Sequence, residues 1–265
     1  SSNYAEDLRI DYSILDQHAE SYRKIRNTFR YLLGNINDNF ENINFDELDV
    51  EGLPELEQLM LHKIYILNNN FKRYFNNYDF HNLYKELLNF CTVDLSAFYF
   101  DIRKDNLYCD PIDSEKRKST IVLLNIILNA LLKWFAPILS FTTEEIFKLL
   151  FTDQKSIHLE KFLEFPDKFK NQKLNEKWTE LIKIRDICNI SIEEKRASKE
   201  IGSSLEADLK IQLSQKLKNL TENTDFSELC ITSKAEVNYK DDIETVAITS
   251  KAKGSKCSIC WKIKE

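Results

Sequence analysis

The sequence predicts a mainly α protein, a helical bundle followed by a small α+β module. Only 4 glycines and 4 prolines occur in 265 residues, so sharp turns are few and long helices are favoured. Before Gly202, apolar residues recur mostly every three or four positions, which is the period of an amphipathic helix. After Gly202 the spacing changes to that of short strands.

Helices account for the predicted bundle, residues 1–151, whose connections are short to moderate. Residues 101–113 are polar and include Pro111, so a turn is expected there. The fourth helix is almost wholly apolar from Ile121 onward and is expected at the centre of the bundle. The expected helices run from Ser13 to Asn37, from Pro54 to Tyr74, from Tyr84 to Phe100, from Ser114 to Phe135 and from Thr142 to Phe151.

A connector over residues 152–172 is expected to lead to a second region, residues 173–265. This region begins with a long helix, Leu174 to Lys199, for which Gly202 is the expected left-handed cap. Its strands are expected at 205–213, 226–232, 235–239 and 244–249, with a helix near 214–223.

Composition and motifs exclude several classes of protein. The net charge of −6 argues against wholesale adhesion to nucleic acid, although local basic patches remain possible binding sites. No apolar run approaches the roughly 20 residues that span a bilayer. The sequence has no Gly-rich phosphate loop, nucleophile elbow or His-Glu-x-x-His helix, so nothing in it supports bond chemistry. Six widely spread cysteines favour reduced thiols and a cytoplasmic protein.

Basic residues on the first helix are the first candidate for nucleic-acid binding. Arg23, Arg26 and Arg30 share one helical face, and Asn27 lies beside them. Guanidinium groups suit phosphate contact and an amide suits base-edge recognition. A solvated helix face is the alternative interpretation of the same pattern.

A second candidate is Arg103 with Lys104, which follow Tyr99 and Phe100. Aromatic rings next to cations can stack on unpaired bases, although ordinary packing explains the aromatics equally well.

The third candidate lies near the end of the sequence, where Cys257 and Cys260 have the spacing of half a zinc knuckle. Trp261 follows at once, among lysines, and is either the plug of a knuckle or an exposed stacking surface. A structural zinc site needs four ligands, so this pair predicts a piece of a longer protein.

Several separated stretches resemble the bacterial-type isoleucyl-tRNA synthetase family in the part that follows its catalytic domain. The opening residues 1–10 are similar to the exit from the synthetase core. The most specific matches are YRKIRNTFRYLLGNIND (22–38), LSAFYFDIRKDNLYCD (95–110), FAPILSFTTEEIF (135–147), KRASKEIGSSLEADL (195–209) and KCSICW (256–261).

The resemblance implies a class I enzyme that joins isoleucine to its tRNA with ATP and magnesium, and a region that binds the anticodon stem-loop. It implies that Arg26, Asn27 and Arg30 face the anticodon, that Arg103 and Lys104 form the partner turn, and that Trp261 closes on the loop. It also implies that Cys257 and Cys260 are two of four zinc ligands, and that the protein is a cytoplasmic monomer.

The ATP-binding motifs of the class and the editing insert are missing from this sequence, so this chain by itself is expected to be inactive. Two alternatives stay open: a helical interaction scaffold with no tRNA role, and the same region of a valyl or leucyl enzyme.

Overall fold

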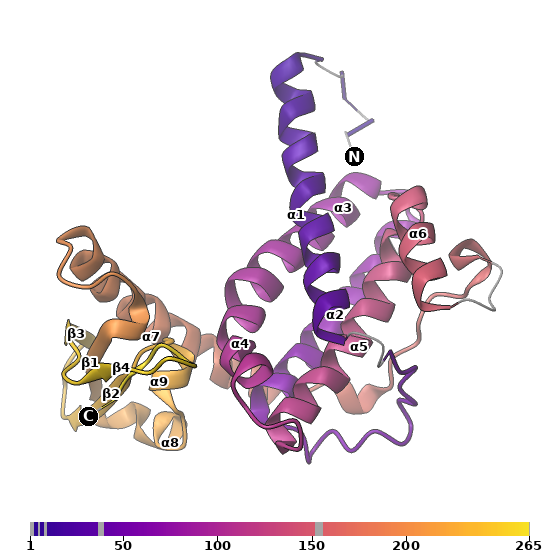
Figure 1. Ribbon diagram of the computed structural model, residues 1–265. Helices are drawn as coiled ribbons and strands as arrows, with labels where there is room; N and C mark the ends of the chain where they lie inside the picture. Colours follow the sequence, from indigo (N-terminus) through magenta and orange to yellow (C-terminus); the bar gives the residue numbers. More distant parts are fainter. Residues whose placement is uncertain (1–2, 5, 8–9, 37–39, 152–155, 265) are drawn as a thin grey trace. The chain divides into compact units, whose positions relative to one another are not determined.

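The computed structural model describes residues 3–4, 6–7, 10–36, 40–151 and 156–264. The chain divides into two compact units, residues 1–171 and 172–265, and each is described by itself (Figure 1). The first unit is helical and the second combines helices with small sheets, so the mainly α prediction is confirmed.

The first unit is a bundle of helices (Figure 1). Its elements are α1 (Tyr12–Ile36), α2 (Glu55–Asn76), α3 (Phe80–Asn89), the π-helical η1 (Phe90–Phe100), α4 (Asp101–Tyr108), α5 (Glu115–Phe135), α6 (Ser140–Leu150), η2 (Ile157–Leu159) and η3 (Asp167–Phe169).

Helix α5 forms the centre of this unit, as expected from its apolar sequence. It contacts α1, α2, α4 and α6, and 13 of its 21 residues are buried. Among the described residues it is the one helix long and apolar enough to cross a membrane, yet 72% of the apolar window is buried inside the fold. Its apolar surface is therefore accounted for by packing in the bundle.

The prediction of a turn over residues 101–113 is wrong for residues 101–108, which form helix α4. Helices α3, η1 and α4 follow one another directly, and the chain stays helical to Tyr108. Ile102 and Leu107 are buried and give α4 an inward apolar side, which the polar composition of the segment concealed. The true turn comes after Tyr108, and Ser114 then caps α5 by accepting a hydrogen bond from the Arg117 N–H.

Residues 156–171 pack on the bundle and belong to the first unit. Phe165 and Phe169 form an aromatic cluster with Phe45, which precedes α2. The Asn171 N–H donates to Nδ1 of His62 at 3.0 Å and ties the end of this segment to α2.

The second unit packs a long helix on a small sheet. β1 is the central strand, parallel to β2 and antiparallel to β3, and α7 contacts β1 and β3. The elements are α7 (Gln172–Ala197), η4 (Ser204–Glu206), β1 (Ala207–Ser214), η5 (Gln215–Leu217), α8 (Lys218–Thr221), α9 (Phe226–Leu229), β2 (Lys234–Lys240), β3 (Val246–Lys251), β4 (Ser255–Lys256) and β5 (Ile263–Lys264).

Two sequence predictions for this unit are wrong. Residues 226–232 begin with the short helix α9, because the Asp225 side chain accepts hydrogen bonds from two backbone N–H groups and starts a helical turn there. The left-handed cap of α7 is Lys199, with φ of 60°, instead of Gly202. The Glu200 N–H bonds to the Lys195 carbonyl, as in a Schellman ending.

Candidate nucleic-acid interface

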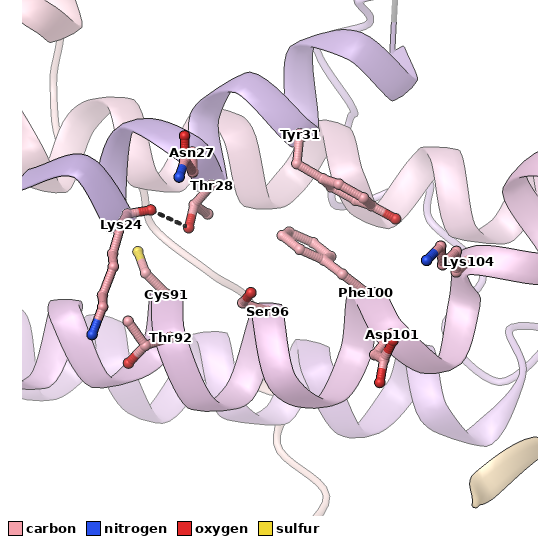
Figure 2. A pocket seen from close by; sticks show the side chains of 10 residues that line it. All are labelled: Lys24, Asn27, Thr28, Tyr31, Cys91, Thr92, Ser96, Phe100, Asp101 and Lys104. Atoms are coloured by element: carbon pink, nitrogen blue, oxygen red, sulfur yellow. Dashed lines mark hydrogen bonds between the residues drawn. The ribbon is translucent and has the colours of Figure 1, made fainter. Parts of the chain in front are cut away.

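A groove of about 520 Å³ lies in the first unit between α1 and the continuous run of η1 and α4 (Figure 2). The α1 side supplies Lys24, Asn27, Thr28 and Tyr31. The opposite side consists of Cys91, Thr92, Ser96, Phe100, Asp101 and Lys104. We refer to this feature as the groove.

Helical spacing explains the α1 side of the groove. Its four residues stand at i, i+3, i+4 and i+7, so they form one stripe along the helix. Lys24 and Asn27 are exposed, whereas Thr28 is buried and donates its hydroxyl to the Lys24 carbonyl at 3.2 Å. The stripe thus exposes the Lys24 ammonium and the Asn27 amide to solvent, while Thr28 packs beneath them.

The floor of the groove is aromatic. The rings of Tyr31 and Phe100 stack with centroids 4.2 Å apart and an interplanar angle of 20°. Burial, together with nearby Tyr108 and Asp101, raises the pKa of Tyr31 well above its usual range, so its hydroxyl is a neutral donor. That hydroxyl oxygen is buried and has no hydrogen-bond partner among the described residues.

The groove has a lysine at each end, with neutral groups and one carboxylate between them. Figure 2 shows Lys24 and Lys104 at opposite ends, with Ser96 and the Phe100 ring between them. Lys104 and Ser96 are exposed, and Asp101 is the one carboxylate among the described residues that line the groove. Lysine ammonium groups attract phosphates, while hydroxyl, amide and aromatic groups suit a base.

The three arginines of α1 lie on the helical face next to the groove. At about 100° per residue, Asn27 stands between this arginine face and the groove stripe. All three arginines are exposed. Arg23 pairs with Glu20 at 2.5 Å, whereas Arg26 and Arg30 have no ion-pair partner among the described residues. The face therefore carries uncommitted cations beside the groove.

Arg103 does not belong to this surface, contrary to the sequence prediction. Its side chain is buried and makes two 2.7 Å hydrogen bonds to the Glu57 carboxylate, from Nε and from Nη2. Tyr99 is fully buried and donates to the same carboxylate, so it offers no face to a base. Of the second candidate group, Lys104 and Phe100 reach the groove.

The structure therefore brings Asn27 and Lys104 together, although they are far apart in sequence. Most residues of the groove were not predicted as site residues from the sequence. These are Thr28, Tyr31, Thr92, Ser96 and Asp101. Spacing alone would have placed Thr28 and Tyr31 with Asn27, but it could not show which helix they face.

The cysteine pair of the second unit lies on a tight turn between β4 and β5. The Cys257 N–H donates to the Lys262 carbonyl, and the Trp261 N–H donates to the Cys257 carbonyl. Backbone N–H groups of Cys260 and Ile259 direct hydrogen bonds to the Cys257 sulfur and lower its pKa to about 7. A thiolate is the form that binds metal, so the turn suits a metal ligand.

A complete zinc site is not formed by the described residues. No group of three or more His, Cys, Asp or Glu side chains in that part of the chain could hold a metal ion. Cys257 and Cys260 provide two of the four ligands that a structural zinc requires. By themselves they do not fit the metal.

Trp261 extends from the same turn and is 58% exposed. The Lys256 ammonium lies 5.2 Å from the centroid of its ring, a cation–π contact. Its backbone has φ of 62°. The ring is therefore presented to solvent with a cation beside it, which excludes the role of a buried plug in this structure.

Comparison with known proteins now defines the class of this protein. Residues 57–212 match the family described as the anticodon-binding domain of tRNA ligase. This match covers more than half of the chain, and the chain belongs to that family.

The relatives that it resembles over its whole length are isoleucine–tRNA ligases. It is 68% identical over 263 residues to the enzyme of Pelagibacter ubique (strain HTCC1062), a match that covers 99% of this chain and 29% of the relative. The enzyme of Bartonella henselae is 37% identical and that of Zymomonas mobilis 38% identical, each over 99% of this chain and 28% of the relative. The resemblance expected from the sequence is confirmed, and the chain spans less than a third of these relatives.

Proposed function

We propose that this chain binds the anticodon stem-loop of an isoleucine tRNA, as the tRNA-recognition part of an isoleucine–tRNA ligase. The groove is the observation that carries this proposal. Two lysines separated by a partly aromatic surface that bears hydroxyl groups and one carboxylate, Asp101, match an unpaired base with a phosphate on each side. That arrangement favours an internal nucleotide of a single strand over a duplex.

The neighbouring residues have complementary roles in this proposal. Arg26 and Arg30, with Arg23, contact phosphates outside the groove and set the register of the loop. Asn27 lies at the boundary, where its amide can donate to and accept from a base edge. Trp261 stacks on a further unpaired base through its exposed ring. Arg103 is not included, because its guanidinium is buried against Glu57.

The activity of the whole ligase is likewise a proposal for this protein. It would join isoleucine to tRNA with ATP and magnesium, in the cytoplasm and as a monomer, through residues that lie outside this chain. Cys257 and Cys260 would supply two of four zinc ligands, with the remaining ligands from outside the described residues. We derive no step through the metal.

A filter-binding titration of the 265-residue chain tests the proposal. Isoleucine tRNA and the same tRNA with a swapped anticodon are compared at low salt. We expect tighter binding of the cognate anticodon, and we expect Arg26→Glu with Arg30→Glu to abolish it. Equal affinity for both tRNAs would contradict anticodon recognition by this chain.

The alternative of an interaction scaffold without a tRNA role predicts a different result. A scaffold has no cognate preference to lose, so the charge reversal would leave its weak, non-specific binding indistinguishable between the two tRNAs. Charge-preserving Arg26→Lys with Arg30→Lys is the matched control. It keeps phosphate attraction and removes only the bidentate geometry.

A further inference from the structure

Glu57 is a fully buried carboxylate at the centre of the first unit. Arg103 donates to both of its oxygens at 2.7 Å, the Tyr99 hydroxyl donates at 3.0 Å and the Thr120 hydroxyl at 3.3 Å. These side chains come from α2, η1, α4 and α5. One carboxylate therefore joins four elements of the bundle.

Both oxygens of the Glu57 carboxylate accept hydrogen bonds. A buried ion pair is tolerated when its geometry is good and further hydrogen bonds satisfy the charged groups, and Tyr99 supplies such a bond here. Burial and the Glu57 carboxylate both raise the pKa of Tyr99, so the phenol stays a neutral donor. Arg103 and Tyr99 are each held in one position by the same acceptor.

The residues that follow each of these donors in sequence line the groove. Tyr99 precedes Phe100, and Arg103 precedes Lys104. Consecutive residues on a helix point in different, fixed directions, about 100° apart in α4, so the donors that face Glu57 determine where Phe100 and Lys104 point. Asp94 on η1 adds a second link to α2, through a 2.6 Å ion pair with Lys63.

We propose that Glu57 is a positioning residue for the groove: by holding Tyr99 and Arg103 it keeps Phe100 and Lys104 at the separation from α1 that one nucleotide needs. Glu57 itself contacts no RNA. The π-helical form of η1 is consistent with such a role, because π-helical segments are rare and frequently lie at functional sites. The inference rests on the proposed function, since it specifies how the same groove is organised.

The test compares Glu57→Gln with Asn68→Ala in the whole chain. Asn68 is a matched control, because it is also a buried polar residue of α2, but its bonding partners are not followed in sequence by residues that line the groove. It donates to the Leu163 carbonyl and accepts from the Trp134 indole. Both variants break a buried polar network, so both are expected to lower stability.

Hydrogen exchange provides the first measurement and needs no RNA. Glu57→Gln is expected to speed exchange selectively in residues 90–108, whereas Asn68→Ala is expected to leave that segment protected. Tyr99→Phe removes one donor and is expected to have a smaller effect of the same kind, which serves if Glu57→Gln does not fold. Unchanged protection of 90–108 in a folded Glu57 variant would overturn the proposal.

Binding provides the second measurement. Glu57→Gln is expected to reduce the preference for the cognate over the swapped anticodon by about tenfold, while Asn68→Ala keeps the wild-type ratio. A loss of active protein lowers both affinities equally and leaves the ratio unchanged, so the ratio separates positioning from instability. If the wild-type chain shows no preference, the proposed function fails, yet the exchange data still decide the role of Glu57. A wild-type ratio in a folded Glu57→Gln overturns the positioning role.

Discussion

Arg103 is a buried cation, and its ion pair with Glu57 gives it a structural role inside the bundle. The residue is 3% exposed, and its guanidinium forms a bidentate pair with Glu57. Sequence placed it next to Lys104, which is exposed and lines the groove. Two adjacent basic residues on one helix thus point about 100° apart, so one pairs with a buried carboxylate and the other lines the groove.

Replacing Arg103 with Met tests the importance of this ion pair for stability. The free energy of unfolding is expected to fall by about 3–5 kcal/mol, because the Glu57 carboxylate is left buried without its partner. Urea unfolding followed by circular dichroism measures the change. Adding Glu57→Leu is expected to recover most of the loss, since no uncompensated charge then remains. A cost below about 1 kcal/mol for the single variant would contradict a desolvated pair.

Trp261 is the exposed tryptophan of this protein, since Trp134 and Trp178 are buried. Its fluorescence is therefore expected to be accessible to acrylamide in the free chain and protected when tRNA is bound. Trp261→Ala is expected to weaken tRNA binding by about 1–3 kcal/mol through the loss of one base stack. Trp261→Phe is the control and should retain most of the affinity. Full affinity of the Ala variant would exclude stacking.

At the scale of elements, apolar periodicity was sufficient to place the helices of the bundle. The structure has α1 at Tyr12–Ile36 and α5 at Glu115–Phe135, each within a residue of the expected ends. Periodicity was insufficient where polar residues lie on the outer side of a helix, as in α4. It also could not reveal that η1 is π-helical, because a π-helix has no distinct apolar period in this sequence.

Residues 226–229 show a second limit of periodicity. Buried Phe226 and Leu229 fit a short helix as well as a strand, and the N-cap decides between them. The Asp225 side chain accepts hydrogen bonds from the N–H groups of Ser227 at 2.9 Å and Glu228 at 3.1 Å. Local hydrogen bonding therefore determined the structure of this element.

Asp225→Ala is expected to lower the stability of the second unit by about 1 kcal/mol, the usual value of an N-cap. Burial raises the pKa of Asp225, but the hydrogen bonds from Ser227 and Glu228 outweigh it, and the net pKa is lowered. A lowered folded pKa means that the stabilisation is present above the unfolded pKa, about 3.9, and is lost as pH falls through the folded pKa.

Thermal unfolding at neutral pH and near pH 3 measures this dependence. The difference between wild type and Asp225→Ala is expected to shrink at acid pH. Asp225→Asn is the control, because an amide caps without titrating and its stability relative to Asp225→Ala should vary less with pH. A difference that grows on acidification would contradict the sign.

At the scale of the whole molecule, a net charge of −6 coexists with a basic surface on α1. The bulk charge repels RNA, so binding must depend on a few converging cations. Lys24, Lys104, Arg26 and Arg30 are exposed at or beside the groove. Phosphate contacts by these groups would be sensitive to salt.

The salt dependence of tRNA binding is expected to be modest, because only a few cations would contact phosphates. Five contacts to a single strand, from the two groove lysines and the three arginines of α1, predict a slope of about −3.5 for the logarithm of the affinity against the logarithm of salt concentration. Arg26→Gln with Arg30→Gln should make that slope shallower by about 1.4. Lys133→Gln is a control, because Lys133 lies outside the groove and pairs with Glu160. A slope unaffected by the arginine changes would exclude them from phosphate contact.

The sequence by itself determined the helical class, the order of most elements and the relationship to isoleucine–tRNA ligases, because these depend on periodicity and on local motifs. Only the tertiary structure decided which side chains share a site. It buried Arg103 against Glu57, joined Asn27 to Lys104 across the groove, and left Trp261 exposed. The physical reason is that a recognition surface is made where elements distant in sequence pack together. Helical spacing predicts which residues share one face of a helix, but it does not predict which other element packs against that face.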